Sequence, residues 1–167
     1  GLRDNIFVIN SFSKYFGMTG WRVGWVVAPK KYINALDAIA QNTYLATSTI
    51  SQYAAIAAFK EESMLIHEQH RQIFQQRRDL ICQSLGDLDI QVPVIPQGAF
   101  YVYANVSKFC GDSYRFCNDL LEEKAVAITP GCDFGEQHAN EFVRFAYTTS
   151  EDRIKLGMQR LKQFISG

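Results

Sequence analysis

The hydrophobic pattern of the chain changes near residue 60, and this change constrains the fold more than any other feature. Before it, the apolar segments carry few charges, as in elements buried inside a larger structure. After it, apolar and polar residues alternate as in a self-contained α+β domain. The pattern therefore predicts an α/β chain in two parts, residues 1–62 and residues 63–167, with the boundary close to a long helix.

The first part contains two short segments with the character of strands. Residues 6–9 are apolar and largely β-branched, and residues 22–28 are apolar at nearly every position, which is typical of a strand buried on both faces. Helices are expected over residues 30–41 and 51–59. Because no Met opens the chain and the first strand has nothing before it to pair with, we expect the chain to be the C-terminal portion of a longer protein.

The second part begins with the spacing of a long amphipathic helix over residues 63–85, which Gly86 ends. In the rest of this part the sequence predicts strands at 90–95, 99–106, 125–128 and 142–147, and helices at 113–123 and from about 151 to 165. Thr149 and Asp152 have the spacing of a capping box for the last helix.

Charge and composition exclude several classes of partner. Lys plus Arg and Asp plus Glu both number 17, so the chain has no net charge to attract nucleic acid or an anionic membrane. The longest uncharged stretch, residues 38–59, holds too many polar side chains for a membrane span. The first residues lack the pattern of a secretory signal, so we expect a cytoplasmic location.

Neither the cysteines nor the histidines predict a metal site. The four cysteines form no Cys-x-x-Cys pair, and we expect all of them to be buried or partly buried thiols. His67 and His70 lie three residues apart on a helix, but no further ligand follows at a convincing spacing. A solvated helix face explains this pair better.

A polar loop after the first strand carries a lysine among hydroxyl and guanidinium groups. Ser11 and Ser13 precede Lys14, and Arg22 follows it, with glycines that allow the loop to fold back. A nearby cation and apolar surroundings favour the neutral amine of a lysine, and imine formation requires this neutral form. The guanidinium fork and the hydroxyls predict an anion site beside that amine.

A second arginine lies in the alternating strand at residues 142–147. Val143, Phe145 and Tyr147 share one face of that strand, so Arg144 stands on the other face among small and apolar neighbours. A partly buried arginine needs a partner, and a structural ion pair is one explanation.

Residues 11–24, SFSKYFGMTGWRVG, closely resemble the pyridoxal-phosphate attachment signature of class I/II aminotransferases. The resemblance implies the end of the large cofactor domain of a fold type I enzyme over residues 1–62, followed by the small C-terminal domain. It also implies that Lys14 forms a Schiff base with pyridoxal 5'-phosphate and moves a proton at the substrate α-carbon. The carboxylate that protonates the pyridine ring would lie upstream.

The same resemblance assigns roles to the other polar residues. Ser11 and Arg22 would bind the cofactor phosphate, and Arg144 would bind the substrate α-carboxylate. Ser13 is a candidate for the phosphate as well, although a serine beside a tight turn often caps the backbone instead. The loops at 96–101 and 129–135 resemble loops of the family's small domain, where aromatic side chains such as Phe134 are expected to pack.

The sequence therefore predicts an aminotransferase that moves an amino group between an L-amino acid and a 2-oxo acid, as a homodimer in its full-length form. Two alternatives stay open: a pyridoxal-phosphate lyase of the same fold, and a catalytically silent truncated module. The motif does not identify the amino acid or the oxo acid. We expect the isolated chain to have little turnover, because most of the positioning groups would lie upstream.

Overall fold

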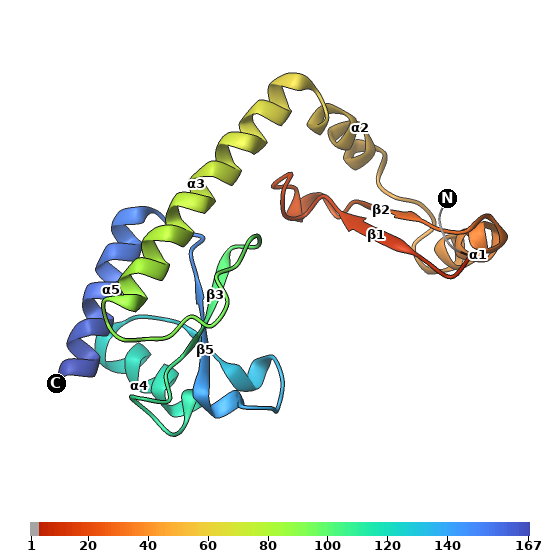
Figure 1. The fold of residues 1–167 in the computed structure, drawn as a ribbon. Coiled ribbons are helices and arrows are strands. Elements are labelled where there is room, and N and C mark those ends of the chain that lie inside the picture. Colours follow the sequence, from red (N-terminus) through yellow and green to blue (C-terminus); the bar gives the residue numbers. More distant parts are fainter. Residues whose placement is uncertain (1–3) are drawn as a thin grey trace. The chain divides into compact units, whose positions relative to one another are not determined.

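A computed structural model describes residues 4–167 of the chain (Figure 1). The contacts divide the chain into two compact units, Gly1–Arg71 and Gln72–Gly167, and the division falls inside helix α3 (Glu61–Gly86). It lies farther along this helix than the predicted boundary at 62/63, and the assignment of residues 1–62 to a cofactor domain stays a prediction. No helix among the described residues is long and apolar enough to cross a membrane.

The first unit is built on an antiparallel ribbon of two strands, in which Ser11 pairs with Gly24. A 3-10 turn at Thr19–Trp21 lies in the connection between the strands, and a second one at Lys30–Tyr32 leads into the helices. The elements of this unit are β1 (Val8–Ser11), β2 (Gly24–Val27), α1 (Ile33–Thr43) and α2 (Thr49–Ala58).

The ribbon is exposed in the part of the chain that the structure describes. Every residue of β1 and β2 is exposed, and Ile9 is 81% exposed. The burial of a strand depends on which elements cover it, and among the described residues these two strands pair only with each other. The burial of residues 22–28 inside a larger structure therefore stays a prediction. The core of this unit is small and comprises Phe12, Met18, Ala55 and Ala58.

The second unit combines a three-stranded antiparallel sheet with helices, and the strand order is β3-β5-β4. Two 3-10 turns, Gly131–Asp133 and Ala139–Glu141, lie between β4 and β5. The elements that follow α3 are β3 (Tyr101–Asn105), α4 (Ser113–Lys124), β4 (Thr129–Pro130), β5 (Phe142–Ala146) and α5 (Glu151–Ser166).

The core of the second unit lies against one face of this sheet. Val143, Phe145 and Tyr147 are buried, as their alternation predicted, and they belong to one apolar cluster with Leu120 of α4 and Leu161 of α5. Residues of α3 that follow Gln72 join the same cluster. The opposite face of β5 is therefore available to carry Arg144.

Three sequence predictions in this unit were wrong in detail. Residues 90–95 form no strand and contribute only a bridge from Gln91, because Pro93 in this segment cannot donate to a ladder. Residues 125–128 form no strand either, since Ala125 ends α4 in a left-handed conformation. The N-cap of α5 is Ser150 rather than Thr149, and no side chain caps that helix.

The four cysteines are free, but they are not all buried as expected. Cys132 is exposed, because it lies in the 3-10 turn at the edge of the sheet. Cys117 is buried against the core, and this burial raises the pKa of its thiol to about 12. Within residues 4–167, no three side chains of the metal-binding types come together.

Candidate functional site

The pairing of β1 with β2 brings Ser11 and Arg22 to the same end of the ribbon. Ser11 is the last residue of β1 and pairs with Gly24, only two residues after Arg22. A Cβ atom at position 24 would lie 2.5 Å from the backbone oxygen of Asn10, so the close approach of the strands requires glycine there. The motif glycine therefore sets the distance between the two ends of the loop.

Lys14 lies in a tight turn at the tip of this loop. The backbone N–H of Gly17 donates to the oxygen of Lys14 at 2.9 Å, and Gly17 has a φ of 65°, which favours glycine. Next to the turn, the N–H of Met18 donates to the oxygen of Phe12 at 3.1 Å, and both of these side chains are buried. The backbone around Lys14 is thus fixed, while Lys14 itself is exposed.

The polar residues of the loop are joined by short hydrogen bonds. The hydroxyl of Ser11 accepts from the N–H of Ser13 at 3.1 Å, and the hydroxyl of Thr19 donates to the oxygen of Ser13 at 2.6 Å. The backbone cap that the sequence suggested for Ser13 is therefore formed by Ser11. Because a hydroxyl that accepts one bond can still donate its own proton, Ser11 keeps a donor for an anion.

Arg22 holds the other end of the loop in an unusual conformation. Its φ is 50°, in the left-handed region that side chains other than glycine rarely adopt. Its Nη1 donates to the oxygen of Thr19 at 3.0 Å, which uses one of the five N–H donors of the guanidinium. Together with Lys14 and the hydroxyls, this fork makes the loop suited to an anion that also carries an amine-reactive group.

Arg144, the residue of the second predicted site, lies on the central strand of the sheet in the second unit. β5 pairs it with Tyr103 on one side and with Thr129 on the other. Its Nη2 donates to the hydroxyl of Thr129 at 3.3 Å. Its guanidinium carbon lies 4.6 Å from the ring centroid of Phe134 and 5.3 Å from that of Tyr101, so two aromatic rings orient the guanidinium.

The guanidinium of Arg144 retains unused binding capacity. Its Nε is buried and has no hydrogen-bond partner among residues 4–167. No ion pair joins Arg144 to a carboxylate in the described part of the chain, so the structural ion pair considered from the sequence is not what the structure contains. Buried donors in proteins are normally satisfied, and a carboxylate is the natural acceptor for a planar guanidinium.

The loop after β4 places Phe134 against Arg144, and the close packing of this loop requires a glycine at position 131. A Cβ atom at Gly131 would collide with the backbone oxygens of Ala139 and Phe142 and with the hydroxyl of Tyr103. The rings of Tyr103 and Phe142 stack with centroids 4.9 Å apart, and burial is the main reason that the pKa of Tyr103 is raised. The turn at residues 131–133 therefore packs closely onto the strand that carries Arg144.

The structure thus places Ser11, Ser13, Lys14 and Arg22 together on one loop of the first unit, and Arg144 on β5 of the second unit. Four side chains in these arrangements were not among the predicted site residues: Thr19, Phe134, Tyr101 and Thr129. The sequence holds no direct signal for the last two, since their contact with Arg144 depends on the pairing of distant segments.

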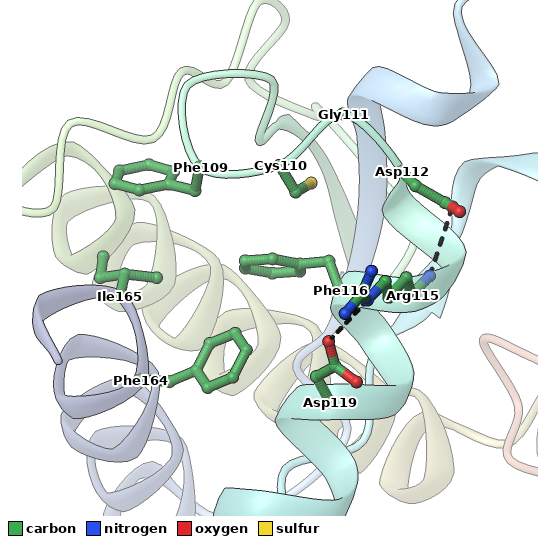
Figure 2. A pocket seen from close by; sticks show the side chains of 9 residues that line it. All are labelled: Phe109, Cys110, Gly111, Asp112, Arg115, Phe116, Asp119, Phe164 and Ile165. Atoms are coloured by element: carbon green, nitrogen blue, oxygen red, sulfur yellow. Dashed lines mark hydrogen bonds and ion pairs between the residues drawn. The ribbon is translucent and has the colours of Figure 1, made fainter.

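The second unit also contains a hollow of about 500 Å³ between α4 and the end of α5. Figure 2 shows its apolar side chains gathered on one side and the ion pair of Arg115 with Asp119, 3.5 Å long, on the other. Asp112 caps the start of α4 at its edge. None of the predicted site residues lines this hollow, so it is separate from both arrangements described above.

Comparison with known proteins identifies relatives over nearly the whole length of the chain. Among curated proteins, the chain is 37% identical over 98% of its length to (5-formylfuran-3-yl)methyl phosphate transaminase of Methanocaldococcus jannaschii, and 36% identical over 96% to valine–pyruvate aminotransferase of Mycobacterium tuberculosis. It is 35% identical over 98% to aspartate aminotransferase of Thermotoga maritima. The chain spans only 40–43% of the length of these relatives.

Solved structures show the same relationship in three dimensions. An aminotransferase of Mycobacterium tuberculosis superposes with a TM-score of 0.94 at 35% identity, over 98% of this chain and 42% of the other. Aspartate aminotransferase of Thermotoga maritima gives 0.87 at 35% identity, over 98% and 41%. The α/β fold expected from the sequence is thereby confirmed for the part that the chain covers. Since the model of the family "Aminotransferase class I and II" also matches residues 2–161, the chain belongs to the class I and II aminotransferases.

Proposed function

We propose that this chain provides the cofactor-binding lysine and the carboxylate-binding arginine of a pyridoxal-phosphate-dependent aminotransferase. Enzymes of this family generally depend on that cofactor. The observation that carries the proposal is the loop that fixes the backbone of Lys14 and also carries the hydroxyl of Ser11 and the guanidinium of Arg22. The proposed reaction moves an amino group between an L-amino acid and a 2-oxo acid.

The donors on the loop fit the chemistry of pyridoxal 5'-phosphate. An aldehyde needs a primary amine, which Lys14 supplies, and a phosphate needs several hydrogen-bond donors. Arg22 and Ser11 would hold the phosphate, and Ser13 would contribute its hydroxyl, because the hydrogen bonds of Ser13 described above use its backbone. When bound, the cofactor withdraws electrons from the α-carbon of the substrate.

The amine of Lys14 would have two tasks in this proposal. It would attach the cofactor covalently, and it would move the proton at the substrate α-carbon. An amine on a fixed backbone turn suits both tasks, since proton transfer needs a donor held within hydrogen-bond reach of the reacting carbon.

Arg144 would bind the α-carboxylate of the substrate. Its buried Nε lacks a partner among the described residues, and the rings of Phe134 and Tyr101 orient the plane of its guanidinium. Two parallel N–H donors of one guanidinium match the two oxygens of a carboxylate. All relatives described above are named as transaminases or aminotransferases, which supports transamination over the lyase alternative.

We further propose that the full-length protein is a homodimer. One side of α2 carries an exposed apolar ridge, in which Ile50, Tyr53 and Ile56 are 72%, 71% and 66% exposed. A contiguous ridge of large apolar side chains indicates a surface that another chain or domain covers. Light scattering of the full-length protein tests this, and a monomer at micromolar concentration would contradict it. A cytoplasmic location stays a prediction from the sequence.

The test of the function uses the full-length protein with pyridoxal phosphate. Borohydride reduces an imine to a stable secondary amine, so mass mapping after reduction should find the label at Lys14. Amino-group transfer from a panel of L-amino acids to 2-oxo acids should accompany this labelling. Labels spread over many surface lysines, with none enriched at Lys14, would contradict the proposal.

A further inference from the structure

One side chain of α3 contacts both aromatic residues that follow Lys14. The ring centroid of His67 lies 5.5 Å from that of Tyr15 and 5.4 Å from that of Phe16. The rings of Tyr15 and Phe16 also meet each other nearly at right angles, with centroids 5.2 Å apart. The three rings therefore form one cluster directly beside the turn of Lys14.

This cluster is also joined to the small core of the first unit. Phe16 contacts the ring of Phe12 at 4.7 Å and that of Phe59 at 5.1 Å. Phe16 consequently contacts both the core and His67. The N–H of Gly17, the next residue, donates to the oxygen of Lys14 and closes the turn. A rotation of the backbone at residues 15–16, which would redirect the lysine side chain, has to break these ring contacts.

A hydrogen bond from the Nε2 of His67 does not explain why this side chain lies against Tyr15 and Phe16. Its Nε2 is buried and has no hydrogen-bond partner in residues 4–167. An unpaired buried nitrogen lowers stability, because it loses its hydrogen bonds with water. The favourable contribution of this side chain therefore comes from its planar ring and the aromatic contacts that it makes.

We propose that His67 is a positioning residue that fixes the direction of the Lys14 amine through its ring contacts with Tyr15 and Phe16. The inference rests on the proposed role of Lys14 as the attachment lysine. His67 then affects the reactions of the Lys14 amine, which depend on the direction of that amine. It does not affect the binding of the substrate carboxylate, which is proposed for Arg144. Small displacements of a reacting group lower the rate much more than they lower binding.

The experiment compares four variants of the full-length protein loaded with pyridoxal phosphate. His67→Ala removes the ring, His67→Leu fills the space without a planar ring, and His67→Phe keeps the ring without the nitrogens. His70→Ala is the matched control, because His70 is an exposed histidine on the same helix. For each variant, kcat, KM, the absorbance band of the bound cofactor and borohydride labelling at Lys14 are measured.

The expected result separates the ring from the nitrogen. His67→Ala and His67→Leu should lower kcat about tenfold while KM stays within about twofold, and they should shift the absorbance band and slow the labelling of Lys14. His67→Phe should restore all these quantities to within about twofold of wild type. His70→Ala should match wild type.

Two outcomes would overturn the inference. Wild-type kcat and labelling in His67→Leu would show that the planar ring has no positioning role, and this variant decides the matter if His67→Ala does not fold. A defect in His67→Phe as large as in His67→Leu would assign the effect to the nitrogen instead. Absence of selective labelling at Lys14 in the wild-type protein would contradict the proposed function itself.

Discussion

The loop of Lys14 and the strand of Arg144 are held in place by different means. The loop depends on hydrogen bonds between its own residues, a close strand approach at Gly24 and a small core under an exposed ribbon. Arg144 lies on the central strand of a sheet whose other face packs on the large core of the second unit. The comparison shows that the residues of a family signature can be held by a locally bonded loop, while Arg144 depends on a sheet packed on a large core.

The largest expected effect comes from removing the lysine itself. Lys14→Ala in the full-length protein should lower kcat at least about 10⁴-fold, because both covalent attachment and proton transfer depend on its amine. Lys60→Ala, which removes an exposed lysine of the same unit, is the control and should retain wild-type activity. If a Lys14→Ala variant kept more than a hundredth of wild-type kcat in a transamination assay, the proposed catalytic role of Lys14 would be wrong.

Removal of the arginine should affect binding more than turnover. Arg144→Ala should lower kcat/KM for amino acids about 10²–10³-fold, mostly through KM, and Arg144→Lys should recover only part of this because it lacks the planar fork. Amines that lack the carboxylate should be insensitive to the change.

The control for this variant is Arg115→Ala, which removes an exposed arginine of the same unit. Steady-state kinetics with each substrate provide the measurement. Wild-type kcat/KM in Arg144→Ala for every amino acid tried would disprove the carboxylate role.

We expect that a methyl group added at Gly131 will destabilise the turn that holds Phe134 near Arg144. Gly131→Ala forces a Cβ against two backbone oxygens, so it should lower the free energy of unfolding by about 1–3 kcal/mol. Gly135→Ala is the matched control, because a Cβ there meets no atom within 4 Å, and it should stay within about 0.5 kcal/mol. Urea denaturation compares the two, and equal stabilities would show that the turn adapts.

The smallest expected effect is a pH dependence confined to the second unit, which contains all four cysteines. Burial raises the pKa of Cys117 from 9.0 to about 12, so the folded chain holds this proton more tightly than the unfolded chain. Stability is then full below about pH 9 and falls as the pH rises toward 12, by about 1 kcal/mol at pH 10. Cys117→Ala should weaken this fall between pH 7.5 and pH 10, and an unchanged fall would assign it to other groups.

The sequence was most informative where structure is local. The alternation over 142–147 predicted which face of β5 is buried, and the signature predicted that Ser11, Lys14 and Arg22 share one loop. Both predictions depend on residues within about a dozen positions of each other. The helices were predicted for the same reason, with their ends displaced by a few residues.

The sequence failed where the result depends on distant segments. It did not show that Thr129, Tyr101 and Phe134 surround Arg144, because that requires the register of β3, β4 and β5. That the hydroxyl of Ser11 caps the backbone N–H of Ser13 depends on rotamers, which a motif does not encode.

The left-handed backbone of Arg22 has a consequence for efforts to stabilise the protein. Such a conformation costs about 1 kcal/mol or more for a residue other than glycine, so Arg22→Gly should relieve strain in the fold. The same change removes the guanidinium proposed to hold the phosphate. Selection for thermal stability alone would therefore favour a substitution that disables the loop, and a screen at this position must score cofactor retention together with melting temperature.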